Sequence, residues 1–134
     1  MVKMRVVYQG QKHCELVHEQ SGSIIETDAP KDNQGKGERF SPTDLVGAAL
    51  TSCILTTMAI VAERDGIALD GSKATVEKRM ADSPRRIESL TVHIWLPASL
   101  TADQRRKMEN TARACPVHKS LHPDVKLPIT FEYV

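Results

Sequence analysis

Aromatic residues are scarce in this chain of 134 residues, where Phe, Trp and Tyr together make up 4%. Such scarcity argues against the stacking platforms on which proteins bind single-stranded nucleic acid. Net charge is also almost absent, because 18 Lys and Arg residues balance 17 Asp and Glu residues to leave a formal charge of +1. No overall field therefore attracts nucleic acid or an anionic membrane. We expect neither as a partner.

Cysteine is equally sparse, with three residues at positions 14, 53 and 115. An odd and small number in a chain of this length does not form the disulfide framework of a small secreted protein. The N-terminal residues 1–8 alternate and carry charges, unlike a signal peptide. The long apolar stretch 45–62 contains four Ser or Thr residues, so we interpret it as a buried core helix rather than a membrane span. We expect a cytoplasmic protein.

Length and composition indicate an ordinary globular protein. With 40% hydrophobic and 26% charged residues, the chain resembles neither a disordered nor a fibrous protein. A domain typically contains roughly 100–200 residues, so we predict a single domain over residues 1–134.

Alternation of apolar and polar residues predicts strands over 4–9 and 12–17, which form a hairpin, and a third strand over 23–27. The Gly- and Pro-rich segment 28–41 predicts a long loop. Further strands are expected over 72–81, 86–97 and 125–134.

Two helices have capping signals. Ser41, Pro42 and Asp44 predict the start of a helix that runs to about Arg64, with Gly66 ending it. Thr101 and Gln104 predict the start of a second helix, which ends near Cys115 because Pro116 follows; residues 118–121 form one more turn. The resulting order is β-β-β-α-β-β-α-β, an α+β fold.

The first helix is apolar around most of its circumference. A helix of this kind must be covered on nearly all sides, and one copy of so small a chain covers it poorly. We therefore predict an obligate homodimer with this helix near its centre.

The residues alone leave three interpretations of the cysteines open. In the first, Cys53 and Cys115 form a catalytic thiol and its resolving partner. The loop before the helix carries Lys36, Glu38 and Arg39, so a cation is available to favour the thiolate. Alternatively, they are inert packing residues, as Cys14 is expected to be. The third interpretation is a metal site.

The metal interpretation uses Cys115 together with His118 and His122. This spacing matches no standard structural zinc pattern, and a fourth ligand is missing nearby. We therefore expect no metal.

Two segments resemble the OsmC/Ohr family. They are Gly37-Glu38-Arg39-Phe40-Ser41-Pro42-Thr43-Asp44-Leu45-Val46-Gly47-Ala48-Ala49-Leu50-Thr51-Ser52-Cys53 and Ala112-Arg113-Ala114-Cys115-Pro116-Val117-His118-Lys119-Ser120-Leu121. The first resembles the helix that carries the family's first cysteine, and the second resembles the segment of its second cysteine. The resemblance implies curved antiparallel sheets around a central apolar helix, in an intertwined homodimer with two active sites at the subunit interface.

The same resemblance implies a thiol peroxidase of oxidative-stress defence that uses no cofactor. Cys53 would attack an organic hydroperoxide and become a sulfenic acid, Cys115 would resolve it as a disulfide, and an external dithiol would reduce that disulfide. The apolar residues around Cys53 suit an alkyl hydroperoxide better than hydrogen peroxide.

One departure from the family concerns the acid that orients an arginine beside the thiolate. Peroxidases of the family carry a glutamate directly after the proline that starts the helix, and this chain has Thr43 there. Asp44 is half a turn out of phase with Cys53 and is expected to cap the helix. Arg39 and Glu38 are therefore the candidates for the missing pair. The alternative function is a non-enzymatic OsmC-like protein that binds a small apolar ligand at the dimer interface.

Overall fold

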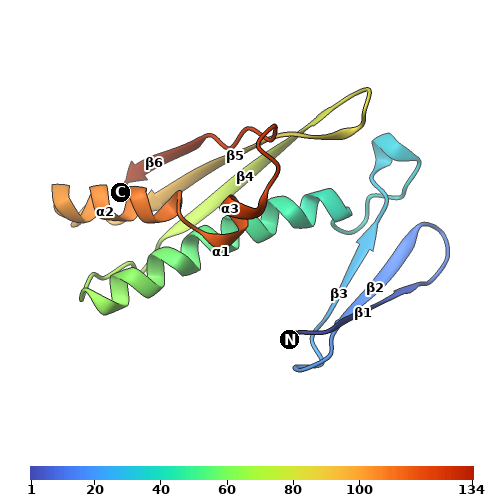
Figure 1. Cartoon of the computed structure of the whole chain (residues 1–134), viewed down its shortest axis with the longest axis horizontal. Helices are drawn as coiled ribbons and strands as arrows, with labels where there is room; N and C mark the ends of the chain where they lie inside the picture. The colour runs from blue at the N-terminus through green and yellow to red at the C-terminus, as the bar shows by residue number, and fades with distance from the viewer. The chain divides into compact units, whose positions relative to one another are not determined.

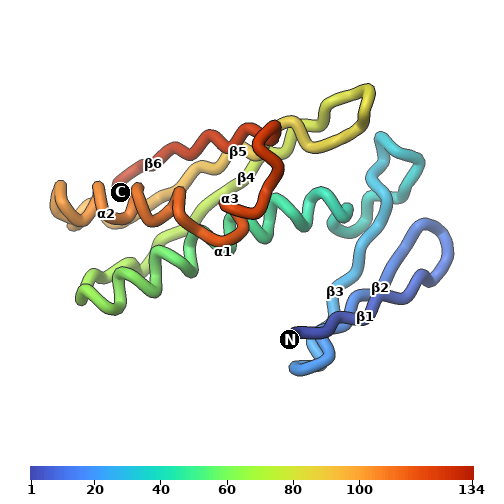
Figure 2. Tube along the Cα trace, in the orientation of Figure 1, coloured from blue at the N-terminus to red at the C-terminus, as the bar shows by residue number.

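The computed structural model describes residues 1–134, which form two compact units, Met1–Val46 and Gly47–Val134. Each unit is described by itself below, with element labels as in Figure 1. Both contain a three-stranded sheet; η1 and α1 follow the first sheet, and α2 and α3 lie between β5 and β6 of the second (Figures 1 and 2). The predicted α+β class is confirmed.

The N-terminal unit consists mainly of an antiparallel sheet in the order β1-β2-β3, with β1 at Met4–Tyr8, β2 at His13–His18 and β3 at Ile24–Asp28. These strands lie within one residue of the predicted limits. The predicted loop follows β3 and contains one short 3-10 helix, η1, at Lys31–Asn33.

Helix α1 (Pro42–Arg64) begins in the N-terminal unit and continues into the C-terminal unit. The Asp44 carboxylate accepts a hydrogen bond from the Ser41 N–H at 2.9 Å, and the Asp44 N–H donates to the Ser41 hydroxyl at 3.1 Å. This reciprocal pair is the predicted cap. The helix is followed by Gly66 at φ +67°, a conformation that glycine adopts without strain.

The C-terminal sheet has the order β4-β5-β6, with β4 at Lys73–Ala81, β5 at Arg86–Leu96 and β6 at Ile129–Tyr133. The expectation of wholly antiparallel sheets is wrong at one pair, because β6 lies parallel to β5. Two helices connect these strands, and such a crossover returns the chain to the end of the sheet from which β5 started. Strands β4 and β5 form the expected antiparallel hairpin.

Helix α1 packs on this sheet through one face, and in Figures 1 and 2 it runs along the β4–β5 hairpin. A Cβ atom on Gly47 would lie 3.2 Å from Leu90 and 3.6 Å from Val76, so helix and sheet approach closely there. The core comprises the buried α1 residues Gly47, Leu50, Thr51, Ile54, Met58 and Ala62 and the buried β5 residues Leu90, Val92, Ile94 and Leu96. The alternation that predicted β5 therefore marks its buried face.

The predicted second helix and the further turn after it correspond to α2 (Ala102–Ala112) and α3 (Pro116–Ser120). Thr101 and Gln104 form the predicted capping box on α2. The helix ends three residues earlier than predicted, because Cys115 adopts an extended conformation and caps α3 instead.

Length and composition alone would also allow α1 to cross a membrane, a property that it shares with the core helices of soluble proteins. Its buried face against β4 and β5 matches the interpretation of α1 as a core helix.

Candidate functional site: a thiol pair and an arginine network

Cys53 lies in the middle of α1, beside the face that packs on the sheet, and its side chain is half-buried. One turn later on the same helix, the Thr57 hydroxyl lies 3.8 Å from the Cys53 sulfur. An i, i+4 spacing places the two groups on the same side of the helix.

Cys115 is the N-cap of α3 and has no exposed surface. Its sulfur accepts a hydrogen bond from the His118 N–H at 3.2 Å. Pro116 at the first helical position sets the turn that aims the free N–H groups of α3 towards sulfur.

The structure places the two predicted cysteine side chains near enough for each to shift the pKa of the other. Burial alone would raise the pKa of Cys53. The Val117 N–H, the Cys115 thiol and the Thr57 hydroxyl together outweigh burial, so the pKa of Cys53 lies below that of an ordinary thiol.

The pKa of Cys115 is raised, first because the thiol is buried and then because it donates to Cys53. Cys53 is therefore the better thiolate, and Cys115 remains the protonated donor. None of the three donors to Cys53 carries a charge.

His118 does not supply a cation to this site. Burial, together with the positive charges of Lys119 and Arg113, lowers the pKa of its imidazole, which favours the neutral ring. His122 is exposed, and its Nδ1 accepts a hydrogen bond from the Asp124 N–H at 3.1 Å.

No three His, Cys, Asp or Glu side chains in the chain are grouped to hold a metal ion. The geometry therefore gives no support to the metal interpretation of Cys115, His118 and His122. Cys14 lies on β2 across from Tyr8 and Thr27 and is half-buried.

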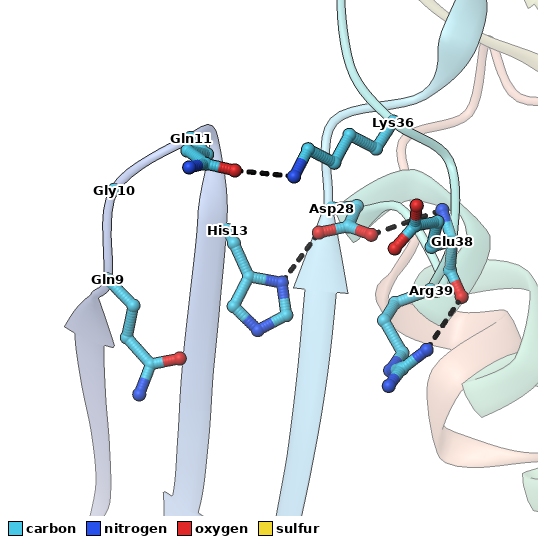
Figure 3. Close-up of a pocket in the computed structure, with 8 residues that line it drawn as sticks. All are labelled: Gln9, Gly10, Gln11, His13, Asp28, Lys36, Glu38 and Arg39. Carbon is cyan, nitrogen blue, oxygen red and sulfur yellow. Dashed lines mark hydrogen bonds and ion pairs between the residues drawn. The ribbon is translucent and has the colours of Figure 1, made fainter.

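The other two predicted residues, Arg39 and Glu38, lie in the N-terminal unit beside a polar pocket of about 260 Å³ (Figure 3). The acid that contacts Arg39 is Glu26 on β3, with 3.2 Å between Arg39 Nε and Glu26 Oε2. Glu38 contributes through its main chain: its carbonyl accepts from Arg39 Nη1 at 3.1 Å, and its N–H donates to Asp28 at 3.1 Å.

His13 completes this network from β2. Its Nδ1 lies 2.6 Å from Asp28 Oδ1, the contact drawn in Figure 3, and its Nε2 lies 3.1 Å from Glu26 Oε1. Carboxylates only accept hydrogen bonds, so both contacts are satisfied when both ring nitrogens carry a proton. The bond to Asp28 first, and the bond to Glu26 second, raise the pKa of His13.

The two carboxylates respond in the opposite direction. The pKa of Asp28 is lowered by its hydrogen bond to His13, and the pKa of Glu26 is lowered by Arg39 and then by His13. The hydrogen bonds therefore favour the charged form of His13 and of both carboxylates.

Sequence reasoning missed His13, Glu26, Asp28 and Thr57. The first three belong to neighbouring strands, and the register pairs His13 with Asp28 and Glu15 with Glu26. One face at this end of the predicted sheet thus carries several charged residues, a signal that was available once the β2–β3 register was assumed. Thr57 could have been found from its i, i+4 spacing to Cys53.

A second pocket, of apolar character, lies along α1. A pocket of about 270 Å³ is lined by Leu55, Thr56, Ala59, Leu69 and Ser72. Neither cysteine of the thiol pair lines it.

The sequence was compared with protein-family models and with curated proteins. The family model described as OsmC-like protein matches residues 35–130. A search of the curated proteins gives no match.

Solved structures share the fold over the whole chain. A crystal structure from Psychrobacter arcticus 273-4, described as a candidate osmotic stress induced and detoxification response protein, is 42% identical, with a TM-score of 0.94 over 98% of this chain and 96% of that one. An organic hydroperoxide resistance protein OsmC from Legionella pneumophila is 16% identical, with a TM-score of 0.80 over 100% and 97%. An organic hydroperoxide resistance protein from Elizabethkingia anophelis is 14% identical, with a TM-score of 0.80 over 100% and 96%. The last two similarities establish the fold alone.

Proposed function

Because this chain belongs to the OsmC-like protein family, we propose that it reduces organic hydroperoxides with Cys53 as the attacking thiolate and Cys115 as the resolving thiol. The observation that carries the proposal is the unequal thiol pair: a half-buried Cys53 with a lowered pKa beside a fully buried Cys115 with a raised pKa. Some structural neighbours are named as organic hydroperoxide resistance proteins, which fits this substrate class.

The first step forms a sulfur–oxygen bond. The Cys53 thiolate attacks the terminal oxygen of the hydroperoxide, the O–O bond breaks, and the alkoxide leaves and takes up a proton as the alcohol. Two electrons pass from sulfur to the peroxide, and Cys53 becomes a sulfenic acid. A thiolate is required because the thiol is a poor nucleophile.

The second step joins the two sulfurs. Cys115 attacks the Cys53 sulfenic acid, a disulfide forms, and the hydroxyl leaves as water with the proton of Cys115. An external dithiol then exchanges with this disulfide, becoming oxidised and returning both cysteines as thiols. Each thiol shifts the pKa of the other, which supports the assignment of the two cysteines to one site.

Arg39 is proposed to favour the Cys53 thiolate, as the family resemblance implies. The homodimer is proposed on the same basis. The three neutral donors lower the pKa of Cys53, and this effect adds to that of any cation.

The test is consumption of cumene hydroperoxide in the presence of a dithiol. We expect Cys53→Ser to abolish turnover, Cys115→Ser to stop at a sulfenic acid that a dimedone probe traps, and the control Cys14→Ser to match the wild type. A wild-type rate no higher than that of Cys53→Ser overturns the proposal.

The alternative, a non-enzymatic protein that binds a small apolar ligand, is favoured by the apolar pocket along α1. It predicts that both thiols stay reduced when the protein meets cumene hydroperoxide. It also predicts that Ala59→Trp, which fills the pocket, abolishes binding of an apolar dye without altering either thiol.

A further inference from the structure

The face of the C-terminal sheet that is turned away from α1 carries the only tryptophan of the chain. Along β5 the buried residues alternate with Thr91, His93 and Trp95, which therefore lie on the opposite side of the sheet. Such a face is usually polar when the other face forms the core. A large aromatic side chain on it is the exception that requires an explanation.

A pocket of about 370 Å³ lies on this outer face. It is lined by residues from all three strands: Thr75, Glu77, Thr91, His93, Trp95 and Thr130. The strand register accounts for their grouping, because Thr75 and Thr130 both pair with His93, and Glu77 pairs with Thr91. Side chains opposite one another on paired strands are neighbours on the same face. The pocket belongs wholly to the C-terminal unit.

The aromatic part of this outer pocket is held in place. Trp95 and His93 pack edge to face, with 4.2 Å between the ring centres and 64° between the ring planes. The His93 Nδ1 lies 2.7 Å from the Thr130 hydroxyl and the Nε2 lies 3.0 Å from Glu132 Oε2, so β6 fixes the imidazole. Trp95 is thus braced before a ligand binds, which lowers the entropic cost of binding.

The polar part of the pocket has groups that the chain leaves free. The hydroxyls of Thr75 and Thr91 and the carboxylate of Glu77 make no side-chain hydrogen bond or ion pair within the chain. The Lys73 ammonium lies 5.3 Å from the centre of the Trp95 ring. An ammonium only donates hydrogen bonds, a carboxylate only accepts them, and hydroxyls do both. A matching ligand therefore both donates and accepts.

Charge narrows the class of ligand further. A small anion would be repelled by Glu77, and a small cation would be repelled by Lys73, because like charges brought together oppose binding. A neutral ligand with several hydroxyl groups meets neither penalty. An apolar face on the same ligand would pack on the Trp95 ring through dispersion contacts. A pyranose sugar combines these properties, with hydroxyls around its rim and C–H groups on its face.

From this geometry we propose that the outer pocket over Trp95 and His93 is a binding site for a neutral sugar. A pyranose unit packs on Trp95, and the sugar hydroxyls bond to the hydroxyls of Thr75 and Thr91 and donate to the carboxylate of Glu77. Neither cysteine of the thiol pair lines this pocket, so the inference does not depend on the proposed function.

The first experiment uses the full chain and the fluorescence of Trp95, which reports on the pocket alone because no other tryptophan is present. The titrants are D-glucose, N-acetyl-D-glucosamine and the trisaccharide maltotriose. Sodium acetate, tetramethylammonium chloride and glycerol serve as the anion, the cation and the polyol without a ring. We expect a saturable change with at least one of the sugars and with none of the three control compounds.

The second experiment measures the same sugars by calorimetry on variants of the pocket. Trp95→Ala should abolish binding, whereas Phe40→Ala, which removes another exposed aromatic side chain, should not.

Two milder substitutions test the polar groups. Glu77→Gln and Thr91→Val should each raise the dissociation constant by about two- to tenfold, the effect of one hydrogen bond. Glu15→Gln, which changes a strand carboxylate of the other sheet, should match the wild type. If Trp95→Ala melts well below the wild type, these two substitutions of exposed side chains carry the test, since both keep the shape of the side chain.

The outcomes are decisive in either direction. Binding of a monosaccharide supports a site for a single sugar, and binding of maltotriose alone supports a site for a unit within a longer sugar chain. No saturable change with any of the three sugars overturns the proposal. Acetate or tetramethylammonium binding as tightly as the sugars overturns it too, as does wild-type affinity in both Glu77→Gln and Thr91→Val.

Discussion

At the scale of single residues, the two thiols differ in how easily they ionise, because their surroundings differ. Cys53 receives hydrogen bonds from a main-chain N–H, a thiol and a hydroxyl, whereas Cys115 is fully buried and donates to Cys53. The direction of electron flow in the proposed reaction therefore follows from which sulfur is ionised.

The Thr57 hydroxyl gives a test of this point at one residue. Thr57→Val removes the hydroxyl that faces Cys53 and keeps the shape of the side chain, so the pKa of Cys53 should rise and alkylation by iodoacetamide at pH 7 should slow by about two- to fivefold, the effect of one neutral hydrogen bond. Thr57→Ser should retain most of the rate.

Thr56→Val is the matched control, because the Thr56 hydroxyl bonds to the main-chain carbonyls of Ser52 and Cys53 and not to the sulfur. Equal rates for Thr57→Val and the wild type would contradict the role of this hydroxyl.

At the scale of elements, half-buried side-chain contacts to Tyr133 join α2 to β6. The Tyr133 hydroxyl donates to Glu109 Oε1 at 2.7 Å, and the Arg105 guanidinium lies 4.1 Å from the centre of the Tyr133 ring. Burial, and then the bond to Glu109, raise the pKa of Tyr133 to about 12.

This raised pKa predicts a stability change in alkaline solution. Because the folded-state pKa lies above the ordinary tyrosine value of about 10, the contribution of Tyr133 is complete below pH 10 and is lost as pH rises towards 12. In a Tyr8→Phe background Tyr133 is the remaining tyrosine of the two, and its absorbance titration should have a midpoint of about 12.

Glu109→Gln should move that midpoint to lower pH. Urea unfolding between pH 9 and 11 provides the second measurement, in which Tyr133→Phe should lose less stability with rising pH than the wild type. Parallel curves for the two proteins would contradict this account.

The elements themselves were largely predictable, because their signals are local. The caps Ser41/Asp44 and Thr101/Gln104 and the alternation in β5 each need only a few neighbouring residues. The pairing of Arg39 with Glu26 was not predictable, because it joins a loop to a strand 13 residues away and depends on the β2–β3 register. Position 115 shows a mixed case: the rule for residues before proline identified a boundary there, but the residue begins α3 rather than ending α2.

For the molecule as a whole, exposed apolar side chains indicate surface that a single chain leaves uncovered. Ile60 on α1 is 66% exposed, and Met4, Val6 and Tyr8 extend from the same face of β1 with 59–66% exposure. Apolar side chains exposed together on one strand face, as on β1, are typical of an interaction surface. We expect a second copy of the chain to cover it.

Sedimentation or light scattering should accordingly give twice the mass of the chain. Ile60→Glu should shift this mass towards the monomer, whereas Asn110→Glu, which adds the same charge at an exposed position of α2, should not. A monomeric wild type would contradict the predicted homodimer and the burial of α1 at its centre.

The thiol pair also bears on the stability of the chain. Cys53 and Cys115 are separated by about 60 residues, and the loop between them contains all of β4, β5 and α2. A bond between the two sulfurs would close that loop and reduce the conformational entropy of the unfolded chain, by an amount worth about 4 kcal/mol in the loop-entropy model. Each oxidation in the proposed cycle would therefore raise the free energy of unfolding of the C-terminal unit, and each reduction would lower it. The melting temperature would then report the oxidation state of the protein.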